Sequence, residues 1–173
     1  AAANEGFAEE ETRETEETQA DAPQIEEAGT CTSMNGVDGI TLSFPCADLS
    51  DTAIDNLKKL IAAKSKLIQM ALEIDATPVE ISNEAISFPW LPGTSPSEMV
   101  EATSRFLAAL IKLAKKLKRS TVVERETDNP RYTFRCFLLR LGFIGDEYKT
   151  ARKFLMKGLP GNGSARHIEM ETQ

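Results

Sequence analysis

The first clear pattern in the chain is an alternation of apolar and polar residues at positions 39–44. Ile40, Leu42 and Phe44 would share one face of an extended strand, because successive side chains in a strand point to opposite faces. Pro45 ends the pattern, and the segment 48–51 then supplies the hydroxyl and carboxylate oxygens that cap helices. The pattern predicts a strand followed by the start of a helix.

A helical spacing of apolar residues continues from about residue 51 to residue 73. Its members recur at steps of three, four or multiples of these: Ile54, Leu57, Ile61, Leu67, Ile68, Ala71 and Leu72. One long helix would place them on a single stripe facing the core. The alternative is a helix that breaks near Ser65 and continues as a strand.

Two short apolar runs follow Pro78 and predict a small β-hairpin. The first run contains Val79 and Ile81, and the second contains Ile86, Phe88 and Trp90. Pro89 lies inside the second run and has no N–H group to donate to a neighbouring strand. We therefore expect the second run to be an edge strand.

The helical spacing is most regular from about residue 96 to residue 118. Thr94 or Ser95 can cap this helix, and Pro96 suits its first turn. Its apolar face contains Met99, Val100, Thr103, Phe106, Leu107, Leu110, Leu113, Ala114 and Leu117. Positive charges at 115–119 complement the carbonyl end of the helix dipole, which explains them without a ligand.

Two shorter amphipathic helices are predicted within residues 130–158. Asp128 or Asn129 before Pro130 is typical of a helix start, and the glycines of the segment 142–145 turn the chain between the helices. Asp146 can cap the second helix. The glycine-rich segment 158–163 can either end this αα-hairpin flexibly or hold an anion with its backbone amides.

Together these patterns predict an α+β fold with a single domain over residues 37–160. It is mostly helical, with a small antiparallel sheet or hairpin packed on two long helices and a basic, helix-turn-helix-like αα-hairpin at 130–158. Residues 1–36 are predicted to be an acidic, disordered tail, and residues 161–173 a flexible one. The first thirty residues hold ten acids and too few bulky apolar residues to offset the entropy of ordering the chain.

The positive charge is concentrated in the C-terminal part of a chain whose formal net charge is -7. Residues 105–166 hold fifteen bases and five acids, a balance that would attract the phosphates of DNA or RNA. The candidate nucleic-acid-binding residues are Arg131, Arg135, Arg140, Lys149, Arg152 and Lys153. The alternative is a solvated packing hairpin, and Asp146 and Glu147 favour it because they would repel phosphates.

Trp90 and the acidic segment are the candidates for binding a protein partner. An exposed Trp90 beside Pro89 would suit such an interface, whereas a buried one would cap the core under a loop. The acidic segment could mimic nucleic acid, hold the basic face closed, or act only as a solubilising extension.

The sequence offers little for catalysis, metals or membranes. It contains three Cys without a C-x-x-C pair and only one histidine, His167, so neither a zinc site nor a disulfide framework is expected. No nucleophile elbow, metal-binding helix or carboxylate pair is found, which argues against an enzyme, a cofactor or a small-molecule ligand. We find no export signal and no membrane-length apolar run, so a cytoplasmic protein is expected.

The stretch from Asn129 to Leu155, with the following Gly-Asn-Gly-Ser-Ala at 161–165, resembles a group of small proteins from Gram-positive gut bacteria. The resemblance is weaker but persists through 57–72 and 86–90, and it covers residues 40–166. These proteins are carried on conjugative and other mobile elements and are often labelled "virulence-related". The resemblance implies a bacterial cytoplasmic protein concerned with DNA handling, conjugation control or defence interference.

Overall fold

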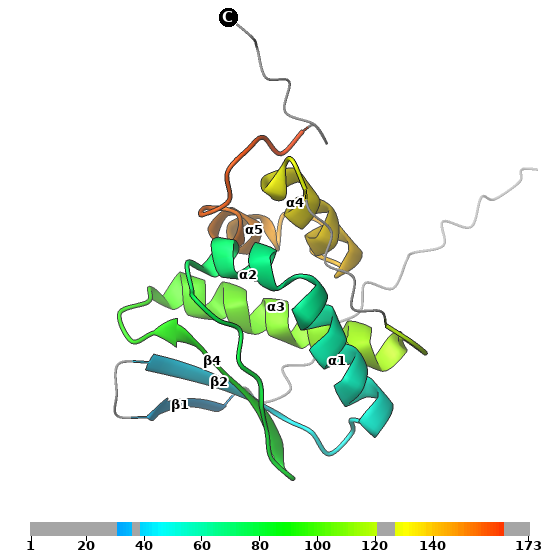
Figure 1. Ribbon diagram of the computed structural model, residues 1–173. Helices are drawn as coiled ribbons and strands as arrows, with labels where there is room; N and C mark the ends of the chain where they lie inside the picture. Colours follow the sequence, from blue (N-terminus) through cyan, green and yellow to red (C-terminus); the bar gives the residue numbers. More distant parts are fainter. Residues whose placement is uncertain (1–30, 36–38, 121–126, 165–173) are drawn as a thin grey trace, which may run out of the picture.

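The computed structural model describes residues 31–35, 39–120 and 127–164, and Figure 1 shows how their helices and strands are arranged. In chain order the elements are β1 (Cys31–Asn35), β2 (Gly39–Pro45), α1 (Asp51–Ala63), α2 (Ser65–Leu72), β3 (Glu80–Ile81), β4 (Ala85–Pro92), α3 (Ser97–Lys116), α4 (Pro130–Arg140) and α5 (Lys149–Leu155). The α+β fold class is confirmed. The predictions for residues 1–30 and 165–173 lie outside the described residues.

The four strands form one antiparallel sheet in the order β1-β2-β4-β3. The predicted strand at 39–44 and the predicted hairpin are both confirmed. Alternate residues of the two central strands are buried: Ile40, Leu42 and Phe44 from β2, and Ile86, Phe88 and Trp90 from β4. Helices α1, α2 and α3 lie on one side of the sheet (Figure 1), and these side chains form the core between the two layers.

The prediction that the second run of the hairpin is an edge strand is wrong. β4 lies between β2 and β3, and Pro89 sits where the register between β2 and β4 shifts. Leu42 pairs with Phe88 and Ile40 with Leu91, so two residues of β4 face one residue of β2. A proline is tolerated at such a bulge because the ladder is already interrupted there.

The prediction of a disordered tail up to residue 36 is wrong for residues 31–35, which form β1. This strand pairs with β2 from Cys31 opposite Ser43 to Asn35 opposite Gly39. The pairing of main-chain groups leaves little trace in the pattern of apolar residues, so the sequence did not indicate this strand.

The long helix predicted for residues 51–73 is interrupted. α1 begins after Ser50, whose hydroxyl accepts a hydrogen bond from the Ala53 N–H, and it ends at Ala63. Lys64 leaves helical geometry with φ -123° and ψ 11°, and α2 then begins at Ser65. The alternative placed a break near Ser65, and the chain does break there, but a helix follows instead of a strand. The apolar stripe continues across the break, with Leu57, Ile61, Leu67 and Ile68 all buried.

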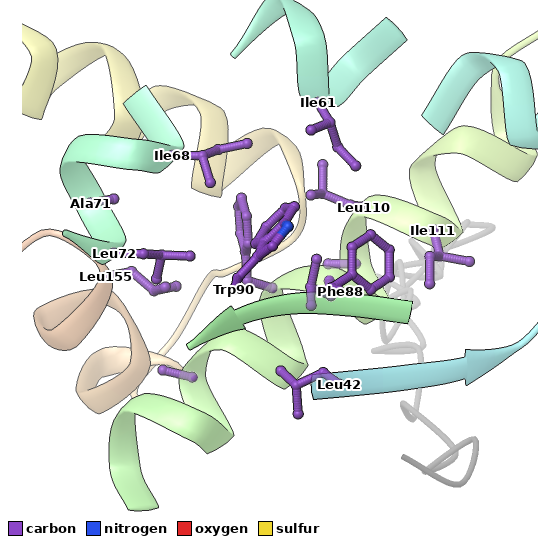
Figure 2. Close-up of a cluster of buried hydrophobic side chains, with 14 of the residues drawn as sticks. Leu42, Ile61, Ile68, Ala71, Leu72, Phe88, Trp90, Leu110, Ile111 and Leu155 are labelled. Carbon is purple, nitrogen blue, oxygen red and sulfur yellow. The ribbon is translucent and has the colours of Figure 1, made fainter. Parts of the chain in front are cut away.

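α3 is the central helix of the molecule, as its regular apolar spacing predicted. Its N-cap is Pro96, without a side-chain hydrogen bond from Thr94 or Ser95. Figure 2 shows Leu110 and Ile111 of α3 beside Phe88 of the sheet. Phe106 contacts the α4 rings of Phe134 and Phe137, with centroid separations of 5.7 and 6.2 Å.

α4 and α5 lie on the side of the helical layer away from the sheet (Figure 1). α4 begins as predicted, with the side chain of Asn129 accepting from the Tyr132 N–H. Gly142 and Gly145 have φ of 95° and 94°, values that favour glycine, and they turn the chain toward α5. α5 packs against α3, and its N-cap is Tyr148 without a side-chain bond from Asp146.

Trp90 is buried, so of its two predicted roles the one in which it covers the core is confirmed, and the candidate partner-binding role that required its exposure is wrong. Only 4% of its surface is exposed, and its ring contacts Phe88 edge-on at 5.3 Å between centroids. The indole N–H donates to the carbonyl of Pro78 at 2.7 Å. Figure 2 shows the ring surrounded by Ile68, Leu72 and Leu110. A large ring whose single donor is satisfied inside the protein stabilises the core.

Trp90 is the only tryptophan, so its fluorescence reports this site directly. We expect iodide to quench native Trp90 far less than a free tryptophan derivative, because the quencher cannot reach a buried ring. Unfolding in guanidinium should restore quenching to the level of the free derivative. Equal quenching of the folded and unfolded protein would contradict the burial.

Two glycines near the end of the described chain differ in what a side chain would meet. A Cβ at Gly158 would lie 2.5 Å from the backbone oxygen of Met70 in α2. At Gly163 the nearest atom would be the Arg135 Cδ at 3.9 Å, an ordinary contact. Gly158 therefore permits close packing of the chain after α5 against α2.

Gly158→Ala should lower the free energy of unfolding by about 1–3 kcal/mol, the usual cost of forcing extra volume into a packed site. The matched variant Gly163→Ala should stay within about 0.5 kcal/mol of the wild type. Urea unfolding followed by Trp90 fluorescence measures both. An equal effect of the two substitutions would show that the contact with α2 is not tight.

Candidate nucleic-acid interface

The densest group of exposed positive charge lies at the end of α3. We call this group the α3 lysine cluster; its members are Lys112, Lys115, Lys116, Lys118 and Arg119. All five are exposed, and no acidic residue lies between them in the sequence. Within the described ranges, none of them forms an ion pair.

A buried asparagine on α1 fixes the position of this cluster. The side-chain amide of Asn56 donates to the carbonyl of Leu117 at 2.7 Å and to that of Ala114 at 3.4 Å. Ala114 lies in the last turn of α3 and Leu117 is its C-cap, and carbonyls at the end of a helix have no partner within it. Asn56 therefore caps α3 from a neighbouring helix and sets the direction in which the chain leaves it.

The first turns of α4 place Arg131 and Arg135 on one side of the helix. The Arg135 Nη1 donates to the carbonyl of Gly163 at 2.7 Å, and the Arg131 N–H donates to that of Pro160 at 3.2 Å. The Asn129 amide donates to the carbonyl of Asn162 at 2.9 Å. The glycine-rich segment is thus held against α4, and residues 161–164 of the tail predicted to be flexible lie beside this helix. Three hydrogen bonds from α4 and its cap hold it there.

Arg140 lies on the opposite side of α4 from Arg131, because nine residues at 3.6 per turn amount to two and a half turns. Between them the outward face of the helix contains Tyr132, Arg135, Cys136 and Leu139. Leu139 is 39% exposed, and Ile144 in the turn after α4 is 66% exposed. The arginines of α4 therefore border a partly apolar surface and do not form one charged face.

The three α5 candidates divide into two exposed lysines and one structural arginine. Lys149 and Lys153 are exposed and share a face of the helix by their spacing of four residues. Arg152 is half-buried, and its Nη1 donates to the carbonyl of Phe143 at 2.7 Å. Arg152 thus ties the glycine turn to α5. Arg152 keeps its positive charge, but its hydrogen bond stabilises the fold.

Arg105 on α3 contributes little to the positive surface. It forms salt bridges with Glu101 at 2.9 Å and with Glu147 at 3.7 Å, and its guanidinium lies 5.9 Å from the centroid of the Tyr148 ring. Burial raises the pKa of Tyr148 above its ordinary value; the Glu147 carboxylate adds to this rise, and Arg105 opposes it. One of the two acids expected to repel phosphates is therefore paired with an arginine.

The structure keeps the predicted residues on neighbouring helices but separates their roles. Arg131, Arg140, Lys149 and Lys153 form no ion pair and no side-chain hydrogen bond within the described residues, whereas Arg135 and Arg152 each bind a carbonyl. The sequence patterns did not identify Lys112, Tyr132, Leu139 and Ile144 as surface residues of this region. Tyr132 and Leu139 lie on the helix face away from the buried Phe134. Their helical spacing could have shown that part of this surface is apolar.

The described part of the chain gives no evidence for a metal site or a membrane-spanning helix. No group of three or more His, Cys, Asp or Glu side chains is placed to hold a metal there. Within the same ranges, no helix has the length and apolar character needed to cross a bilayer. The one histidine lies outside the described residues.

The chain matches no protein-family model, no curated protein and no solved structure.

Arg152 and Lys153 are adjacent cations with different roles, so they form a matched pair for a test. Arg152→Ala should lower the free energy of unfolding by about 1.5–3 kcal/mol, because it removes a charge-assisted hydrogen bond to Phe143. Lys153→Ala should change it by less than about 0.5 kcal/mol. Chemical denaturation measures both. Equal stabilities of the two variants would contradict the structural role of Arg152.

Proposed function

We propose that this protein is a non-enzymatic accessory protein that contacts nucleic acid through the cations of α3, α4 and α5. The observation that carries the proposal is positive charge that has no acidic partner among the described residues. The α3 lysine cluster, Arg131, Arg140, Lys149 and Lys153 have no ion pair within the described residues. The proposal extends the candidate set by the α3 lysine cluster.

The spacing of these charges supports a phosphate backbone as the ligand. Five cations occur within eight residues at the end of α3, and Asn56 holds that end in place. A nucleic acid presents a dense row of phosphates, and each phosphate that a lysine or arginine neutralises releases condensed counterions. Binding of this kind depends on charge density and not on base sequence. We therefore expect contact that is mainly non-specific.

The resemblance to proteins of mobile elements supports the same proposal from a different direction. It favours a bacterial cytoplasmic protein that acts in DNA handling, conjugation control or defence interference. The alternative is a protein-interaction module without a nucleic-acid role. That alternative was based on Trp90 and the acidic segment. Trp90 is buried in the core, and the acidic segment lies outside the described residues.

The proposal is tested by the salt dependence of binding to labelled DNA. The double variant Lys115→Gln/Lys116→Gln should bind more weakly at low salt. Its slope of log affinity against log salt concentration should be shallower by about two, since each lysine accounts for roughly one phosphate contact. Fluorescence anisotropy with duplex and single-stranded oligonucleotides measures both quantities.

A matched control changes the net charge equally at a distance from the α3 lysine cluster. Asn83→Glu/Thr94→Glu places two new charges in exposed turns, one in the β3–β4 hairpin and one before the start of α3. This control should retain nearly all of the affinity. No binding to either form of DNA at about 50 mM salt would refute the proposal, as would an equal loss in the two double variants.

A further inference from the structure

The outward face of α4 carries a surface that phosphate contact alone does not explain. Of the large apolar side chains exposed in the described part of the chain, Ile81, Leu139 and Ile144, two lie on α4 or in the turn after it. Tyr132 lies on the same face, since it is seven residues before Leu139. We call Tyr132, Cys136 and Leu139 the α4 ridge; Ile144 lies in the turn that follows α4.

Tyr132 is not a core residue. It is half-buried, and it belongs neither to the buried cluster nor to the apolar residues packed against that cluster. Within the described residues its ring is not paired with another aromatic ring, and its hydroxyl has no hydrogen bond. By contrast, Phe134 and Phe137 on the inner side of α4 are buried against Phe106. The ring of Tyr132 therefore has surface available for a ligand.

Cations border the α4 ridge on both sides. Helical geometry places Arg135 on one side of it and Arg140 on the other, and Arg131 lies one turn before Arg135. There is no acidic residue from Asn129 to Gly145. A complementary ligand must have flat apolar faces that contact the centre of the α4 ridge. It must also have negative charges that lie near the arginines at the borders of the ridge. Unpaired nucleotides have this chemistry, whereas a duplex stacks its base faces on one another.

We infer that the α4 ridge binds single-stranded nucleic acid, with a base stacked on Tyr132 and phosphates beside Arg131, Arg135 and Arg140. The inference rests on the proposed function and adds that this surface prefers single-stranded nucleic acid to a duplex. Stacking on an aromatic ring tolerates any base, because every base has a π-face. The α3 lysine cluster supplies the general attraction to phosphates, and the α4 ridge selects the unpaired strand.

The test compares Tyr132→Leu with Tyr132→Trp in the full chain. Tyr132→Leu keeps an apolar side chain but removes the ring, so affinity for single-stranded oligo-dT should fall by roughly tenfold. Affinity for a duplex of equal length, and the salt slope, should stay the same. Tyr132→Trp should retain the affinity for the single strand. A 2-aminopurine base in the oligonucleotide should lose fluorescence on binding to the wild type and to Tyr132→Trp, but much less with Tyr132→Leu.

The possible failures are distinguishable. If duplex and single strand bind equally and Tyr132→Leu changes neither, the α4 ridge has no role and the proposed function stands without this inference. If neither form binds at low salt, both proposals fail. If an acidic peptide with apolar residues binds in a Tyr132-dependent way while oligo-dT does not, the α4 ridge is a protein-binding surface and the inference is overturned.

Discussion

Helix α3 is covered on two sides: the sheet lies on one, and α4 and α5 on the other (Figure 1). Leu110 lies beside Phe88 and Trp90 of the sheet in Figure 2, while Phe106 contacts two rings of α4. A helix buried in this way can keep polar residues only along a narrow edge and at its ends. The positive charge of α3 is accordingly concentrated in its final turns, where Asn56 completes the hydrogen bonds of the carbonyls.

Because α4 and α5 cover α3, their residues divide into those that stabilise the fold and those that are left at the surface. Their inner faces cover α3, so Phe134, Phe137 and Leu155 are fully or nearly fully buried. Arg152 and Arg135 then hold the connecting turn and the glycine-rich segment by binding carbonyls. Apart from the exposed Arg135, the residues that remain for a ligand lie outside this framework. Substituting them should alter binding with little effect on the fold, because they have few contacts within the protein.

The sequence predicted the elements that depend on local patterns, namely strand β2, the hairpin, α3 and the starts of α1 and α4. It could not predict β1, which is held by main-chain pairing, or the position of Pro89 at a bulge inside the sheet. The exposed lysines of α5 were predicted from helical spacing. The structural role of Arg152 could not be, because its acceptor is a backbone carbonyl nine residues away and on another element.

The distribution of aromatic residues gives the strongest argument that α4 does more than cover the core. Among the described aromatic residues only Tyr132 and Phe154 keep appreciable exposed surface, and both lie on the two cationic helices. Phe154 also packs against the core, so its position has a structural reason, whereas Tyr132 has none of this kind. An aromatic ring at the surface exposes apolar area to water at a free-energy cost, unless a ligand covers it. Tyr132, with Arg131 and Arg135 within one turn of it, fits a ligand that combines planar faces with negative charge better than it fits a simple polyanion.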